Sequence, residues 1–268
     1  MRKSKKTLLW TVSAEGLSDP CYVFGTMHAK SEMAFKGLDF IKSRIDRCQA
    51  FAAEFDFSEM DQAQWSKSMS LEDGQRLQTL LAPNTYKRLA KILLRETGIS
   101  IQQFDGTKPI LLSNFLAEAQ LSDDRDKFLD AALFAHAQQI GKELLGLESF
   151  HAQMEILRHV PMKEQLKSLK EIATNFKAYR RQIKKIATLY AKADLVKILK
   201  KVKQTVGGLR KSMLYDRNIT MADRMVELGR ERSLFAAIGS AHLGGKKGVL
   251  KLLKDKGCRV FPIVYNRL

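Results

Sequence analysis

The sequence lacks the features of a membrane-spanning or disulfide-bonded protein. Its 268 residues contain no run of about 18 apolar residues, the length that a transmembrane helix requires, so no such helix is predicted. The three cysteines, Cys21, Cys48 and Cys258, are an odd number at wide spacing and match neither a disulfide framework nor a zinc knuckle. We therefore expect them to be small buried residues beside strands.

Acidic residues are also scarce. The chain has 29 Asp and Glu against 46 Lys and Arg, which gives a formal net charge of +17. Much of the excess lies in residues 163–211, which we expect to bind an anionic surface or to form the solvated face of a helical cap; the sequence leaves both interpretations open. Aromatic residues are few in this stretch, so a stacking platform is not expected and nucleic acid is not a predicted partner.

The first residues, Met-Arg-Lys-Ser-Lys-Lys, are similar to the charged start of a signal peptide. The apolar stretch that follows, Leu8-Leu-Trp10, is too short for the core of such a signal. We therefore expect a cytoplasmic chain, or an exported chain or lipoprotein if a longer precursor has been trimmed.

Strand-like and helix-like segments alternate along the chain, which predicts an α/β fold. The expected architecture is a central mixed sheet of about six strands flanked by helices, with a large helical cap, all within one domain of residues 1–268. The strands are expected at 8–13, 21–25, 50–57, 143–148, 234–240 and 259–265. The cap is expected to be formed by helical insertions at about 58–140 and 150–208.

Two segments far apart in the chain share one pattern, in which an apolar strand is followed by glycine, two residues and histidine. They are Gly25-Thr-Met-His28 and Gly239-Ser-Ala-His242. Two other predicted strands carry acids near their ends, Glu54 (with Asp56 close by) and Glu148. If these four strands run parallel, their side chains meet at the carboxyl edge of the sheet, where open α/β folds bind ligands.

Two imidazoles and two carboxylates form a mixed nitrogen and oxygen ligand set that suits Zn, Mn, Co or Fe. We therefore predict His28, Glu54, Glu148 and His242 as metal ligands. The metal would polarise a carbonyl and lower the pKa of bound water, while one carboxylate moved the proton. Each residue also has a structural interpretation, as a hydrogen-bonded histidine, a strand-end acid or an acid favoured at a helix N-terminus.

Arg217 lies on a predicted helix near the end of the chain. Its guanidinium can hold a carboxylate of the site or the terminal carboxylate of a substrate. The alternative is a surface ion pair with Asp216 or Asp223.

Taken in order, these motifs resemble the TraB/GumN family, which includes the TIKI proteins. The resemblance also rests on Lys108-Pro109, Asp130 followed by Ala-Ala-Leu, the Arg217-Asn218 pair, and Leu-Gly-Gly after His242. It implies a fold related to erythromycin-esterase-like and ChaN-like proteins. It further implies a metal-dependent peptidase that acts on a peptide or protein segment, with the two histidines and the acidic residues at its site. We expect Mn, Co or Zn as the metal and Glu54, Glu148, Arg217 and Asn218 as catalytic residues.

The sequence is also compatible with two other functions. One is an esterase-like hydrolase that uses the same histidines and glutamates to activate water without a metal. The other is a non-catalytic protein that binds haem, a peptide or an anionic surface through the cap and its positive charge.

Overall fold

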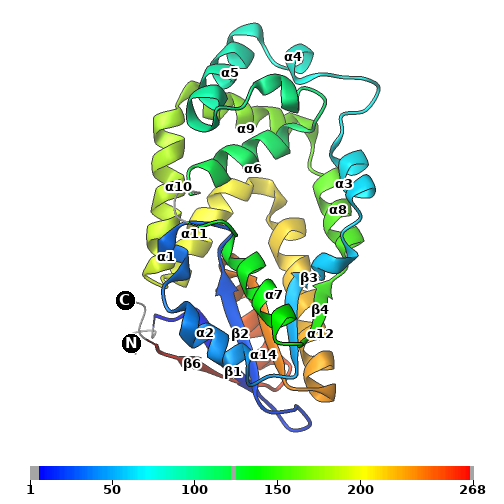
Figure 1. Cartoon of the computed structure of the whole chain (residues 1–268), viewed down its shortest axis with the longest axis vertical. Helices are drawn as coiled ribbons and strands as arrows, with labels where there is room; N and C mark the ends of the chain where they lie inside the picture. The colour runs from blue at the N-terminus through cyan, green and yellow to red at the C-terminus, as the bar shows by residue number, and fades with distance from the viewer. Residues whose placement is uncertain (1–5, 122–124, 266–268) are drawn as a thin grey trace. The chain divides into compact units, whose positions relative to one another are not determined.

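A computed structural model describes residues 6–121 and 125–265 and shows an α/β fold built on one six-stranded sheet (Figure 1). The predicted α/β class and mixed central sheet are confirmed. Residues 1–5, which form most of the charged segment similar to the start of a signal peptide, lie outside the described residues.

The strand order in the sheet is β4-β3-β5-β2-β1-β6. Strands β4, β3, β5 and β2 pair in parallel, whereas β1 is antiparallel to both β2 and β6. The four parallel strands therefore end at one common edge. A shared site for the four predicted residues requires this arrangement. The strands are β1 (Leu9–Ser13), β2 (Cys21–Thr26), β3 (Ala50–Phe55), β4 (Glu143–Glu148), β5 (Leu234–Gly239) and β6 (Arg259–Ile263).

The described chain forms two compact units. The first comprises residues 6–59, 125–153 and 186–265 and contains the whole sheet. Its helical elements are α1 (Glu32–Phe35), α2 (Leu38–Ile45), η1 (Phe57–Glu59), α7 (Leu129–Gln139), the start of α8 (Phe150–Arg158), the end of α10 (Phe176–Ala191), α11 (Leu195–Val206), η3 (Gly207–Leu209), η4 (Lys211–Asp216), α12 (Arg217–Glu231), α13 (Ser240–Leu243) and α14 (Val249–Asp255).

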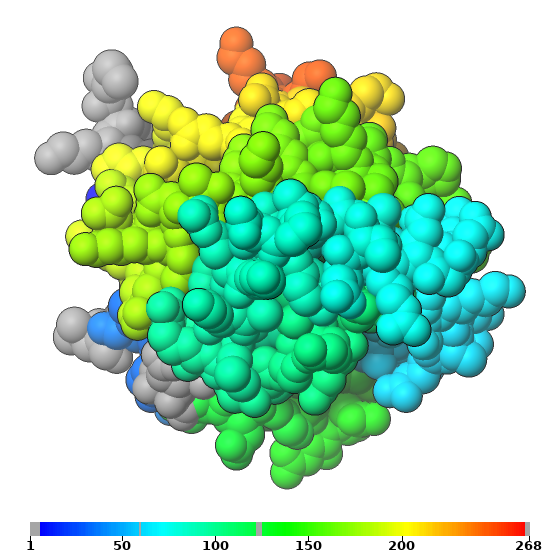
Figure 2. Space-filling view, turned by 90° about the horizontal axis from the view of Figure 1, so that it is seen from above, coloured from blue at the N-terminus to red at the C-terminus, as the bar shows by residue number. Residues whose placement is uncertain are grey.

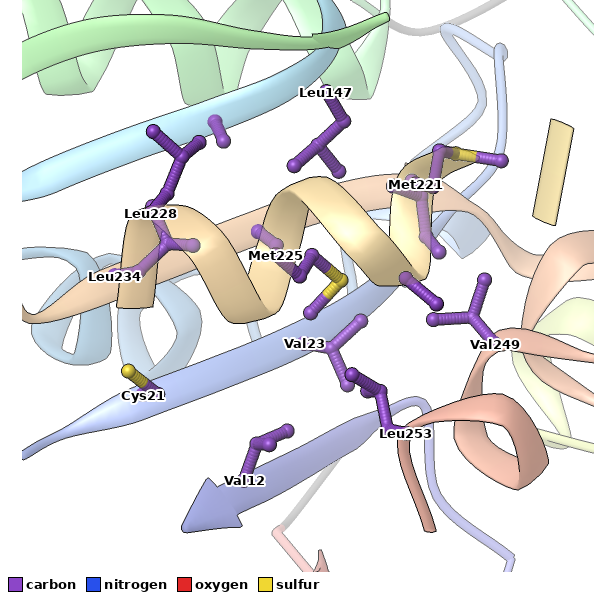
Figure 3. Packing of buried hydrophobic residues seen from close by; sticks show 14 of the residues in the cluster. Val12, Cys21, Val23, Leu147, Met221, Met225, Leu228, Leu234, Val249 and Leu253 are labelled. Carbon is purple, nitrogen blue, oxygen red and sulfur yellow. The ribbon is translucent and has the colours of Figure 1, made fainter. Parts of the chain in front are cut away.

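Apolar side chains of β3 point alternately to the two faces of the sheet, which explains why helices cover both faces. Ala50 and Ala52 belong to the same core cluster as Met221 and Met225 of α12. Phe51, between the two alanines, points to the opposite face and contacts Phe134 of α7 edge-on. Figure 3 shows the side chains of α12 packed among those of β2, β5 and α14. A strand buried on both faces reads as a continuous apolar run, as this one does.

The second unit comprises residues 60–121 and 154–185 and is helical. Its core is formed by fully buried leucines of α5, α6 and α9, such as Leu89, Leu112 and Leu169. Figure 2 shows the close-packed exterior of α4 and α5 in cyan to teal. The elements are α3 (Gln62–Met69), α4 (Leu77–Leu80), α5 (Pro83–Thr97), η2 (Ile101–Phe104), α6 (Pro109–Ala119), the end of α8, α9 (Met162–Thr174) and most of α10.

The ends of α5 follow directly from its sequence. Pro83 occupies its first turn, where a missing N–H costs nothing, and Gly98 ends it in a left-handed conformation with φ of 73°. The unit lies within the predicted insertions 58–140 and 150–208. Two helices from those ranges, α7 and α11, belong to the unit that holds the sheet.

The cysteines behave as expected. All three are buried free thiols, and they lie in β2 or within two residues of the start of β3 or β6. Within the part of the chain that the structure describes, we find no helix with the length and apolar character needed to traverse a bilayer.

Candidate active site

Four parallel strands carry the predicted site residues to one edge of the sheet. His28 follows β2, Glu54 lies in β3, Glu148 ends β4, and His242 follows β5 within α13. The structure joins Glu54, Glu148 and His242 in one buried network and places His28 in a separate pair that lines the same cavity as Glu54.

Arg217 is the residue that links the two glutamates. Its Nη2 donates to Oε2 of Glu54 at 2.6 Å and to Oε2 of Glu148 at 2.7 Å, and its Nε donates to the same oxygen of Glu148 at 2.9 Å. The side chains of Arg217 and Glu148 are only 14% and 4% exposed. Charge-assisted hydrogen bonds in such a place are strong, and removing the cation would leave the buried carboxylate of Glu148 beside the partly buried carboxylate of Glu54.

The alternative interpretation of Arg217, as part of a surface ion pair, does not describe the structure. Asp216 pairs instead with Lys211, and Asp223 pairs with Lys256. Arg217 thus points inward to the carboxylates.

A π-helical segment sets the position of Arg217. The sequence predicts a single helix around Arg217, whereas the structure has η4 in π geometry and begins α12 at Arg217. Such π segments are rare and occur often at functional sites. Met221, one turn further along α12, is fully buried in the core, so this face of the helix is fixed against the sheet.

Glu54 is held at both carboxylate oxygens. Its Oε1 accepts a hydrogen bond of 2.7 Å from the backbone N–H of Gly239, and Oε2 also accepts one of 3.4 Å from Gln153. A Cβ atom at Gly239 would lie 3.0 Å from Oε1, so glycine permits this approach. Burial disfavours the charged form, but Arg217, His242 and the Gly239 N–H outweigh it and lower the pKa of Glu54 to about 2.

Glu148 shares the same guanidinium but titrates differently. Burial is the largest influence and raises the pKa of Glu148, with the neighbouring charge of Glu54 acting in the same direction. Burial alone would lower the pKa of Arg217, but the two carboxylates raise it above its ordinary value. The arginine is therefore permanently charged, and the two acids compete for one cation.

His242 is a buried neutral imidazole. Its Nδ1 lies 2.6 Å from Oδ1 of Asn218, whose amide nitrogen donates to the carbonyl of Lys247 at 2.7 Å. That second bond fixes the amide orientation, so Nδ1 of His242 carries the proton and Nε2 is the basic nitrogen, 3.9 Å from Oε1 of Glu54. Burial lowers the pKa of His242 to about 4.

His28 lines the same cavity as Glu54, and half of its side chain is exposed. Its Nδ1 is 2.8 Å from Oδ2 of Asp130, and its ring stacks on Phe128 with centroids 3.8 Å apart. His28 and Glu54 both line a cavity of about 250 Å³ in the sheet-containing unit. The other lining residues are Thr26, Phe51, Ala53, Phe55, Phe57, Asp130, Ala237 and Gly239.

The structure differs from the prediction in the roles of two acidic residues. Asp56, named as a second acid near Glu54, instead accepts hydrogen bonds from the backbone N–H and hydroxyl of Ser58. Asp130, quoted only as part of a family pattern, is the partner of His28. Asp130 lies in the first turn of α7, where an acid is favoured by the helix dipole alone, so its local sequence gives no signal of this role.

As arranged, the predicted ligands do not fit a metal ion. Among the residues that the structure describes, no three His, Cys, Asp or Glu side chains are placed to hold one. The guanidinium of Arg217 already bonds to both Glu54 and Glu148, where a divalent cation would compete with it, whereas Nε2 of His242 keeps its lone pair because Nδ1 donates to Asn218.

Comparison with known proteins identifies the family. The profile of the TraB/PrgY/gumN family matches residues 8–262. The chain belongs to the TraB/PrgY/gumN family. This confirms the resemblance found from the motifs. No solved structure gives a significant match.

The metalloprotease TIKI2 of Danio rerio is a distant relative of this TraB/PrgY/gumN protein. The two are 23% identical over 320 residues, an alignment that covers 97% of this chain and 61% of the relative. The chain thus spans less than two thirds of the relative's length. Family membership and this relative support a hydrolase or peptidase at the level of the family.

We predict that acid destabilises the protein through His242. Because its pKa is about 4 when folded and 6.5 ordinarily, the unfolded chain binds the proton first. The contribution of neutral His242 to the free energy of unfolding is fully present above about pH 6.5. It is lost as the pH falls toward 4, by at most about 3 kcal/mol. Urea unfolding between pH 7.5 and 4.5 measures this loss.

The variant His242→Gln should show a smaller loss over the same pH range. His159→Gln, which removes an exposed imidazole, is the matched control and should behave like the unsubstituted protein. Identical pH profiles for His242→Gln and the unsubstituted protein would contradict the assignment of a buried neutral histidine.

Proposed function

We propose that this chain is a hydrolase that cleaves a bond in a peptide or protein segment, with the cavity at the carboxyl edge of the sheet as its active site. The observation that carries the proposal is the His28–Asp130 pair on the same cavity as the fixed carboxylate of Glu54. The choice of a peptide substrate is supported by the name of the relative TIKI2, a metalloprotease.

His28 is assigned as the general base. Its Nδ1–H donates to Asp130, so the basic lone pair is on Nε2, and the carboxylate stabilises the imidazolium that forms. Nε2 takes a proton from water as the water oxygen attacks the substrate carbonyl carbon. As the carbon–nitrogen bond breaks, the imidazolium returns that proton to the leaving amine.

Glu54 is assigned to binding. With a pKa of about 2 it stays ionised, so it accepts hydrogen bonds from substrate N–H groups but supplies no proton. The proton for the leaving group must then come from His28.

Glu148, Arg217 and Asn218, which the sequence predicts as catalytic, are assigned as positioning residues. Glu148 holds Arg217, which fixes Glu54, and Asn218 fixes the ring of His242. They do not belong to the described lining of the cavity.

A metal-dependent form of this reaction is the second candidate. The sequence predicts this form, with Mn, Co or Zn bound by His28, Glu54, Glu148 and His242. The name of TIKI2 favours it, whereas the contacts of Arg217 with both glutamates favour water activation by His28.

Anionic-surface binding by residues 163–211 stays a separate prediction. Helix α10 has no acidic residue, and its Lys and Arg side chains are exposed. They are Lys177, Arg180, Arg181, Lys184 and Lys185.

We expect His28→Ala to lower kcat/KM for peptide cleavage about 10²-fold to 10⁴-fold, because it removes the general base. Asp130→Asn should lower it less, since the imidazole remains. Cleavage of a peptide library, followed by mass spectrometry and then by kinetics on the best peptide, provides the measurement.

The matched control is His136→Ala. His136 lies on the same helix as Asp130 and forms a pair of the same length with Asp46, but it does not line the cavity. This variant should keep the rate of the unsubstituted enzyme. Equal rates for His28→Ala and the unsubstituted enzyme would refute the role of His28.

Removal of metal separates the two candidates. Because Arg217 already neutralises the site carboxylates, we expect cleavage to persist after dialysis against a chelator, with no stoichiometric metal found by elemental analysis. Loss of activity in chelator, restored by Mn²⁺, Co²⁺ or Zn²⁺, would select the metal-dependent form and overturn the assignment of His28 as base.

A further inference from the structure

We infer that the cavity binds a lysine or arginine side chain of the substrate beside the bond that is cleaved. The identity of the reaction rests on the proposed function, whereas the preference for a cation rests on the lining of the cavity.

The lining has the opposite charge to the rest of the chain. Although Lys and Arg outnumber Asp and Glu by 46 to 29, the cavity is lined by two carboxylates, Glu54 and Asp130, and by no lysine or arginine among the residues that the structure describes. A cleft lined by one sign of charge concentrates ligands of the other sign. Because no lysine or arginine lines this cavity, its two carboxylates can attract a cation from a bound ligand.

The local cation does not satisfy all of the acids. Glu54 shares the single guanidinium of Arg217 with Glu148. In the described part of the chain, the buried Oδ1 of Asp130 has no hydrogen-bond partner. The negative potential near the cavity is therefore only partly compensated, which favours an incoming ammonium or guanidinium group.

The remaining lining suits the stem of such a side chain. Phe51, Phe55 and Phe57 provide aromatic surface, on which methylene groups pack and a cation is attracted to the ring face. The volume of about 250 Å³ is below the range of about 300–1,000 Å³ typical of whole small-molecule sites, so the cavity matches one side chain.

The first test compares peptides that differ at one position. In the best peptide from the library, lysine next to the cleaved bond is replaced by norleucine, which keeps the apolar stem and removes the ammonium. We expect kcat/KM to fall at least 10-fold, in keeping with a charged hydrogen bond. Equal values for the two peptides, with cleavage observed, would overturn the inference and leave the proposed function standing.

The second test needs no catalysis and no variant. Binding of n-butylammonium and of 1-butanol to the full chain is measured by NMR titration. We expect the cation to bind at least ten times more tightly than the alcohol, and equal affinities would overturn the inference. Preferential cation binding by a protein that cleaves no peptide would overturn the proposed function and support the pocket.

A pair of variants at Phe57 tests whether butylammonium binds in this cavity. Phe57, half-buried on η1, is replaced by lysine or by methionine, which have similar length but differ in charge. Phe57→Lys should weaken butylammonium binding at least 10-fold, whereas Phe57→Met should keep the preference for the cation over the alcohol. Equal cation affinity in the two variants would show that the cation binds elsewhere and would refute the inference.

Discussion

The buried contact of Arg217 with Glu54 and Glu148 is the constraint on which the site depends. A guanidinium and two carboxylates out of water are tolerated only where each finds its partners. Glu54 comes from β3, Glu148 from the neighbouring strand β4, and Arg217 from the first turn of α12. Their contacts hold the helix and the two strands together at the carboxyl edge of the sheet.

The rest of the site follows from that contact. With Oε2 of Glu54 bonded to Arg217, its Oε1 reaches the backbone of β5 at Gly239, where a side chain would crowd it. The same approach sets the distance from Glu54 to His242, which is itself held by Asn218 from the second position of α12. Glu54, fixed in this way, lines the cavity together with His28.

Much of the fold could be predicted from the sequence. Apolar runs that end in glycine or an acid located the parallel strands, and their common direction placed His28, Glu54, Glu148 and His242 at one edge. Side-chain pairing across the edge could not be predicted, because it depends on three-dimensional contacts between residues far apart in the chain, such as Arg217 and Glu54, which are 163 positions apart. A metal and an arginine satisfy the same two carboxylates, so the composition of the site alone does not choose between them.

The features that sequence reasoning missed have a common origin. Asp130 looks like any acid at a helix start, and the π geometry of η4 has no local pattern in Lys211–Asp216. Likewise, α7 has the composition of a cap helix, but its Phe134 packs on Phe51 of the sheet. Each of these features depends on packing partners that are distant in the sequence, and local hydrophobic periodicity carries no information about such partners.

The most direct test of the account is a double-mutant cycle on Arg217 and Glu148, with the free energy of unfolding measured in urea. Arg217→Met alone should cost about 3–5 kcal/mol, because it leaves the buried carboxylate of Glu148 and the partly buried carboxylate of Glu54 uncompensated. Adding Glu148→Gln should recover part of that loss, with a coupling of at least about 1 kcal/mol. The exposed pair Arg224 and Glu227 on the same helix is the control and should couple by no more than about 0.5 kcal/mol. Additive losses at Arg217 and Glu148, equal to those at the exposed pair, would contradict the central claim.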